Sequence, residues 1–200
     1  MATTFNRQYT LLIIFILFYP QQILMADSNI LIIDDRSNAD LTSLSGDEWR
    51  LRTDGVMGGV SEGKISADMV AGRHCVRMRG KVKLDNNGGF IQSTLTLSDK
   101  IVQNINTYSG LVLEVYGNNE EYNIHLRTTD IWLPWQSYRT SFTALPEWKT
   151  LYIPFSKFKP YRIRKDLNVS KLKRIGLVAI GREFNADLCI GKTGLYKDQH

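Results

Sequence analysis

Hydrophobic and polar side chains alternate along much of the chain after residue 26. Between His74 and Leu84 the apolar side chains fall on one side of the pattern, and arginines and lysines fall on the other. A period of two residues is typical of a β-strand that buries one face. Shorter apolar or alternating runs recur further along. Together they predict strands at residues 30–33, 74–84, 90–97, 111–115, 122–126, 137–142, 149–154, 174–180 and 186–190.

The runs are separated by turn signals and not by long amphipathic helices. Gly117-Asn118-Asn119, Pro146-Glu147 and Gly181 lie between them. We expect only short helices, at residues 38–48, 156–158 and 168–172. This spacing predicts an all-β fold, an antiparallel β-sandwich, formed by residues 27–200 as a single domain.

Residues 1–26 differ from the rest of the chain. Arg7 precedes the unbroken apolar run LLIIFILF at residues 11–18, and the small residue Ala26 follows. This order predicts a secretory signal peptide cleaved after Ala26, or else an uncleaved N-terminal anchor. We therefore expect an exported protein, periplasmic or secreted, with a membrane-anchored or mitochondrial location as the alternative. In an oxidising compartment Cys75 and Cys189 could form a disulfide, or they could remain separate thiols.

The glycine-rich stretches do not have the spacing of cofactor loops. TDGVMGGVSEG (53–63) and NNGGF (86–90) lack the G-x-G-x-x-G spacing of a dinucleotide-binding loop. ADLCIGKT (186–193) resembles a phosphate loop, but only seven residues follow it and none can supply the required helix. We interpret it as a last strand followed by a Gly-Lys-Thr-Gly turn. The cysteines and histidines are not at ligand spacing, so we expect neither cofactor nor metal.

Candidate catalytic groups are few. Asp54, Glu62 and His125 could serve as acids or bases, but no pattern links them, and Ser61 lacks the G-x-S-x-G context of a nucleophile. We therefore expect no enzyme.

Two segments suggest binding instead. Residues 157–174 hold eight basic residues and one acid, with Phe158 and Tyr161 between them. This segment could contact an anionic surface or be a solvated loop, and an exported location disfavours nucleic acid. Trp132 and Trp135 lie in a predicted loop, where they could stack on a sugar, contact a protein or cap the core.

Several motifs together resemble the complex I intermediate-associated protein family, known from an assembly factor of NADH:ubiquinone oxidoreductase. They occur in the family's order: Trp49 with TDGVMGGVSEG, NNGGFIQ (86–92), YSGLVLEVYGN (108–118), YNIHLRTT (122–129), YRTSF (138–142), EWKTLYIPFSKFKP (147–160) and IGL (175–177). The resemblance implies a galactose-binding-like jelly roll without an established catalytic centre. It also implies a chaperone-like role in binding membrane-complex intermediates.

The resemblance also marks individual positions. The signature residues are Asp54, Met57, Gly58, Gly59, Ser61, Asn87, Gly88, Gly89, Phe90, Arg127, Tyr138, Phe142, Trp148, Pro154 and Phe155. We expect Phe142, Trp148 and Phe155 in the core and the glycines in turns. We expect the polar members to form either a ligand site or a buried polar network; they are Asp54, Ser61, Asn87 and Arg127.

Two functions follow as hypotheses. The first is a non-enzymatic assembly module with a protein partner, such as a membrane-complex intermediate. The alternative is an exported carbohydrate-binding module that uses Trp132, Trp135 and Tyr138.

Overall fold

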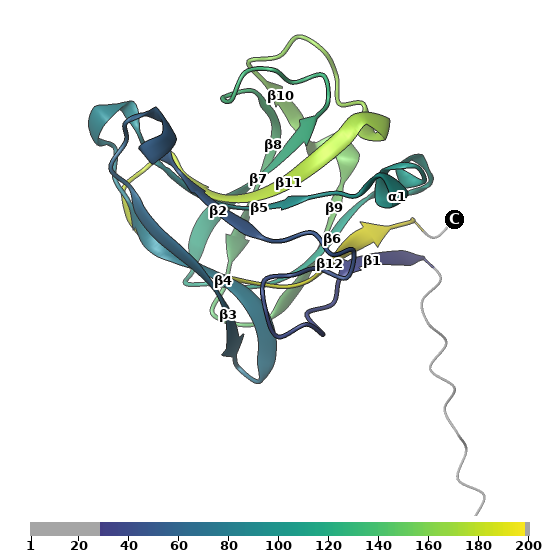
Figure 1. The fold of residues 1–200 in the computed structure, drawn as a ribbon, viewed down its shortest axis with the longest axis horizontal. Coiled ribbons are helices and arrows are strands. Elements are labelled where there is room, and N and C mark those ends of the chain that lie inside the picture. Colours follow the sequence, from purple (N-terminus) through teal and green to yellow (C-terminus); the bar gives the residue numbers. More distant parts are fainter. Residues whose placement is uncertain (1–28, 199–200) are drawn as a thin grey trace, which may run out of the picture.

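The computed structural model describes residues 29–198 as two antiparallel β-sheets that form two layers (Figure 1). The first sheet has the order β3-β4-β12-β6-β9, with β1 beside β12, and the second has the order β10-β8-β7-β11-β5-β2. The strands of the first sheet are β1 (Ile30–Asp34), β3 (Glu62–Val70), β4 (Arg73–Val82), β6 (Gly110–Tyr116), β9 (Lys149–Pro154) and β12 (Phe184–Tyr196). Those of the second are β2 (Arg50–Thr53), β5 (Phe90–Thr96), β7 (Glu120–Thr128), β8 (Ser137–Ala144), β10 (Lys159–Tyr161) and β11 (Leu172–Ile180).

The core lies between the two sheets and is built from the apolar positions of the alternating strands. Met78 of β4, Leu113 of β6, Ile124 of β7 and Leu177 of β11 are all fully buried there. Each such side chain contributes about 1.5–3 kcal/mol by leaving water. The polar positions between them face outward, so the predicted antiparallel β-sandwich is confirmed.

Helical structure is confined to short segments. The only α-helical one in the described range is α1 (Asp99–Val102), and the 3₁₀ turns are η1 (Asp54–Met57), η2 (Asp85–Asn87), η3 (Ile105–Thr107), η4 (Phe155–Lys157) and η5 (Val169–Lys171). Two of these lie close to the short helices expected at residues 156–158 and 168–172. Across residues 29–198, no helix has the length and apolar character needed to span a bilayer. The predicted signal peptide or anchor at residues 1–26 lies outside the described residues.

The helix expected at residues 38–48 is wrong. This segment is an irregular loop, and the buried Arg36 donates hydrogen bonds to the backbone carbonyls of Asn38 and Asp40. Arg36 is itself held by Asp34, whose carboxylate also accepts a hydrogen bond from Trp49 Nε1 at 2.7 Å. Because side chains take the carbonyls that a helix would use, the loop keeps its non-helical path.

The turn expected at Gly-Lys-Thr-Gly (191–194) is also wrong. The strand β12 continues through it to Tyr196, with only a register shift between Ile190 and Thr193. Residues 193–196 pair with β1 on one side and β6 on the other, so both neighbours need an extended backbone here. Because these residues form a strand and the described residues 197–198 form no helix, the segment does not have the structure of a phosphate loop.

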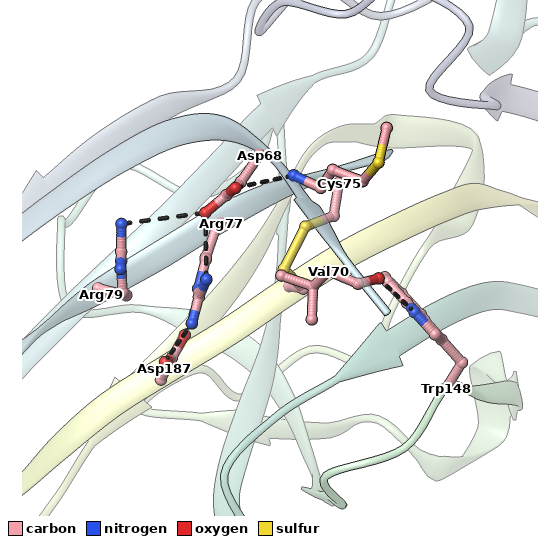
Figure 2. Close-up of a disulfide and its surroundings, with 9 residues drawn as sticks. Asp68, Val70, Cys75, Arg77, Arg79, Trp148 and Asp187 are labelled. Carbon is pink, nitrogen blue, oxygen red and sulfur yellow. Dashed lines mark hydrogen bonds and ion pairs between the residues drawn. A yellow bond between two sulfur atoms is a disulfide. The ribbon is translucent and has the colours of Figure 1, made fainter. Parts of the chain in front are cut away.

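The outer face of the first sheet is covered by paired charges and a disulfide (Figure 2). Cys75 of β4 and Cys189 of β12 are joined, with their Cα atoms 5.4 Å apart, and both are buried. Beside them, Arg77 donates two hydrogen bonds of 2.7 Å to the carboxylate of Asp187 and one of 3.1 Å to Asp68. This arrangement cross-links β3, β4 and β12.

Of the three aromatic residues expected in the core, Trp148 is not there. Phe142 and Phe155 are partly buried and pack against the core. Trp148 is half-buried outside the first sheet, where its Nε1 donates to the carbonyl of Val70 at 3.0 Å (Figure 2). Its role is to hold the β3–β4 hairpin.

Candidate functional site

The signature glycines and polar residues surround one buried carboxylate. Asp54 is fully buried, and its Oδ1 accepts a hydrogen bond from Ser61 N at 3.0 Å. Its Oδ2 accepts from Ser61 Oγ at 2.5 Å, Gly89 N at 2.5 Å and Phe90 N at 3.3 Å. Burial by itself raises the pKa of Asp54, but these hydrogen bonds outweigh it, so the pKa lies below its ordinary value.

Two glycines are required because the chain passes so close to this carboxylate. A Cβ at Gly59 would lie 2.3 Å from Asp54 Cγ, and one at Gly88 would lie 2.4 Å from Asp54 Oδ2. Asp54 thereby joins η1, the start of β3 and the η2–β5 connection, with Asn87 in the η2 turn. With its oxygens occupied by backbone and Ser61, this part of the signature is a structural network and not an open ligand site.

The open site lies next to this network, on the outer face of the second sheet. A cavity of about 270 Å³ lies on the outer surface of these strands. Its walls come from η1, the η2–β5 connection, β5, β7, the β7–β8 loop, β8, β10 and β11. The lining side chains include Val56, Met57, Phe90, Gln92, His125, Trp135, Arg139, Tyr161 and Arg162, and no acidic residue.

His125 lies on the floor of this cavity. It is only 7 % exposed, and its Nε2 has no hydrogen-bond partner within the described residues. Burial, followed by the charges of Arg139 and Arg127, lowers the pKa of His125 to about 3. The imidazole is therefore neutral at physiological pH, and its Nε2 is a buried polar atom without a hydrogen-bond partner in the described residues.

Arginines gather around the histidine. Arg139 lies opposite His125 in the β7–β8 register and stacks over Tyr161 with its Cζ 3.5 Å from the ring centroid. Arg127 and Arg174 are opposite each other in the β7–β11 register. Five arginines form no ion pair with any carboxylate in residues 29–198. They are Arg52, Arg127, Arg139, Arg162 and Arg174.

One of these arginines also shapes the rim of the cavity. Arg127 Nη1 donates to the backbone carbonyls of Leu133, Pro134 and Gln136 at 3.1, 2.9 and 2.8 Å. These bonds fix the β7–β8 loop, on which Trp132 is 88 % exposed and Trp135 is 43 % exposed. Arg127 is thus a positioning residue for the tryptophans.

Across the cavity, η1 presents a second apolar rim. Val56 is 72 % exposed and Met57 is 49 % exposed, and both line the cavity. Gly58 caps this turn with a positive φ of 87°. The two rims border the same cavity, so a bound ligand would meet apolar contacts at both sides of the cavity.

Tyr138 is not part of this surface. It is 2 % exposed, and its hydroxyl donates to the carbonyl of Asp166 at 3.1 Å. The expectation that Tyr138 joins the tryptophans as a sugar-stacking surface is therefore wrong, because its ring belongs to the core. Phe158 of the basic segment is also buried in the core.

The three candidate catalytic groups do not meet in one pocket. Asp54 is sequestered in its network, and Glu62 on β3 pairs with Lys83 at 2.6 Å. Of the three, only His125 lines the cavity. In the part of the chain that the structure describes, no group of three His, Cys, Asp or Glu side chains is placed to hold a metal ion.

The sequence did not single out Gln92 or Arg139, although both fall on the polar side of their strands. Alternation within a strand places a side chain on a face, but the cross-strand register that joins them needs the fold.

Comparison with known proteins identifies the family. The family model described as complex I intermediate-associated protein 30 (CIA30) matches residues 38–190. The chain belongs to the CIA30 family. No curated protein matches it. In this CIA30 domain, the two glycine-rich motifs supply the residues that surround and hydrogen-bond the Asp54 carboxylate.

Solved structures with the same fold include carbohydrate-binding modules of low sequence identity. A family 11 module from Clostridium thermocellum, in complex with a β-1,3-1,4-mixed-linked tetrasaccharide, superposes with a TM-score of 0.67 at 13 % identity. The match covers 86 % of this chain and 98 % of that one. A family 30 module of a cellulosomal cellulase from the same organism has a TM-score of 0.57 at 12 % identity, covering 85 % and 99 %. At these identities the likeness shows the jelly-roll fold alone.

Proposed function

We propose that this CIA30-family chain is a non-enzymatic binding module that holds a protein partner on the outer face of its second sheet. By its family, the partner proposed is a subunit of a respiratory complex I assembly intermediate. The observation that carries the proposal is the hollow over β5, β7, β8 and β11, flanked by two exposed apolar rims.

The composition of this surface supports a protein ligand. Tryptophan, methionine and arginine are enriched at protein interfaces, and here they surround one cavity. Val56 and Trp132 are exposed apolar side chains that nothing in the fold requires to be at the surface. The separation of Asp54, Glu62 and His125 supports a non-catalytic role.

The test is capture of the partner from native membranes with the full-length tagged chain. The rim variant combines Val56→Ser with Trp132→Ala, and the matched control is Tyr152→Ser, a 55 % exposed residue on β9 of the other sheet. We expect the unmodified chain and the control to recover the same membrane-complex subunit. The rim variant should lose it, because truncating an interface hot spot weakens binding by about 2 kcal/mol or more. Recovery that is unchanged by the rim substitutions would rule out this surface.

A second candidate is carbohydrate binding, favoured by the exposed Trp132 and Trp135 of the β7–β8 loop. An exposed indole ring is a suitable platform for a sugar ring. Replacing both tryptophans with alanine should abolish binding on a glycan array if the rim binds sugar. Absence of binding by the intact chain would eliminate this candidate.

We also propose that the chain is exported, with the buried Cys75–Cys189 disulfide as support for an oxidising compartment. Export excludes only a role on the matrix side of complex I, so an exported chain would have to bind a membrane-complex subunit where that subunit faces the exported compartment. Mass spectrometry of the mature N-terminus in fractionated cells decides between export and a matrix location. An N-terminus at Asp27 in an exported fraction would confirm export, and an intact chain at the inner face of a respiratory membrane would contradict it.

A further inference from the structure

The outer face of the second sheet carries positive charge that the described part of the chain leaves unpaired. We propose that this face binds an acidic segment of the partner protein, with the segment's carboxylates held by Arg52, Arg139 and Arg174. The inference rests on the proposed function, because it names the chemistry of the ligand that the binding module would hold.

The two sheets differ in how their arginines are paired. On the first sheet, Arg77 is held by Asp68 and Asp187, and Arg73 lies 3.6 Å from Glu114. On the second sheet, Arg52 of β2, Arg127 of β7 and Arg174 of β11 lie near one another, and Arg139 of β8 lies near Arg162. Within residues 29–198 no carboxylate pairs with any of these arginines. The fold therefore pairs these arginines on the first sheet and leaves arginines of the second sheet unpaired, with Arg139 and Arg162 lining the cavity.

Burial of these unpaired guanidinium groups, together with neighbouring positive charge, is unfavourable until an anion binds. Burial, followed by the charge of Arg52, lowers the pKa of Arg174. Burial likewise lowers the pKa of Arg139; contacts with Tyr161 raise it in part, and the charge of Arg162 lowers it further. A carboxylate on this face would relieve both penalties, and a guanidinium group can bind it through two parallel hydrogen bonds.

Arg139 is already positioned for this contact. Its Nε donates to Ser137 Oγ at 2.7 Å, and its guanidinium group stacks on Tyr161. These contacts fix the side chain before a ligand arrives, which reduces the entropy lost on binding. Beside it, His125 lines the cavity as a neutral imidazole and does not add to the positive charge.

Two features favour a protein segment over a sugar. A neutral sugar presents hydroxyl groups that donate as well as accept, whereas guanidinium groups only donate. An acidic polysaccharide would satisfy the arginines but would leave the aliphatic side chains of Val56 and Met57 without a partner. A peptide with carboxylates along its centre and apolar residues at its ends fits both the floor and the rims.

The test measures binding of a fluorescent octaglutamate peptide to the full chain, with octaglutamine and polygalacturonate for comparison. The variant is Arg139→Gln with Arg174→Gln. Its matched control is Lys64→Gln with Lys81→Gln, two exposed lysines on the first sheet, which removes the same charge. We expect octaglutamate to bind the unmodified chain and the control, and to bind the arginine variant at least about tenfold more weakly. Binding should also fall steeply as salt rises from about 0.05 M to about 0.5 M, because added ions screen these contacts.

Three results would overturn the inference. They are no octaglutamate binding by the intact chain, equal weakening in both double variants, or tighter binding of polygalacturonate than of octaglutamate. These results are separable from failure of the proposed function. If the Val56 and Trp132 substitutions abolish partner capture while octaglutamate does not bind, the surface is an interface but its ligand is not acidic.

Discussion

Replacing Asp54 with asparagine tests whether the family's glycine-rich motifs serve to bury one charged hydrogen-bond acceptor. The substitution keeps the size of the side chain but turns one oxygen into an amide nitrogen. In the better of the two orientations, the amide nitrogen replaces Oδ1 and leaves the N–H of Ser61 without an acceptor. In the other orientation, Gly89 and Phe90 both lose theirs.

The expected loss follows from these contacts. An unpaired buried N–H costs about 1–3 kcal/mol, and changing the remaining hydrogen bonds from a charged to a neutral acceptor costs about 1 kcal/mol each. Because such contributions are not fully additive, we expect the free energy of unfolding to fall by about 4 kcal/mol, a large part of the roughly 5–15 kcal/mol typical of a domain.

Urea denaturation followed by tryptophan fluorescence measures this loss. Trp49 is 1 % exposed and reports on the core. The control is Asp85→Asn, an exposed carboxylate in the adjoining η2 turn, which should change stability by less than about 0.5 kcal/mol. A loss of less than about 1 kcal/mol for Asp54→Asn would refute the structural role of this carboxylate.

The stability lost in Asp54→Asn should also depend on pH. The pKa of Asp54 is lowered in the folded chain, so its stabilisation is complete above the ordinary carboxyl pKa of about 3.9 and is lost as the pH falls through the lowered value. The stability difference between the unmodified chain and Asp54→Asn should therefore shrink in acid. A difference that stays constant down to pH ~2 would contradict the lowered pKa.

Three further predictions concern the loop, the disulfide and the core. Arg127→Met removes the donor to three loop carbonyls, so hydrogen exchange and proteolysis within residues 131–136 should increase; unchanged protection would refute the positioning role. Reduction of the Cys75–Cys189 disulfide, which spans a sequence separation of 114 residues, should lower the free energy of unfolding by about 2–5 kcal/mol in chemical denaturation, and no change would contradict a stabilising bridge. Tyr138→Phe deletes one hydrogen bond but keeps the ring in the core, so we expect a stability loss of about 0.5–1.5 kcal/mol and unchanged partner capture; lost capture would place Tyr138 in the binding surface.

The sequence predicts the sandwich because long runs such as β4 and β7 alternate between apolar and polar residues. Such alternation indicates a strand that buries one face. It misses β2 and β10 because strands of four and three residues are too short to show a period. It also misses β3, where small and charged residues obscure the alternation.

The candidate site is less predictable than the fold. The motifs found in the sequence centre on Asp54, which is buried and fully hydrogen-bonded. The open surface instead depends on which strands become neighbours: β7, β8 and β11 bring together His125, Arg139 and Arg174 from residues up to 49 positions apart. No local pattern carries that information, because register and strand order are properties of the folded sheet.

Site-specific photo-crosslinking in cells that produce the full chain addresses the binding surface directly. A benzophenone amino acid is placed at position 135, on the rim of the cavity, or at position 152, on the opposite sheet. We predict a discrete protein adduct from position 135 that is lost when Arg139→Gln and Arg174→Gln are added, and no such adduct from position 152. An adduct that forms equally from both positions, or only from position 152, would show that the outer face of the second sheet is not where the partner binds.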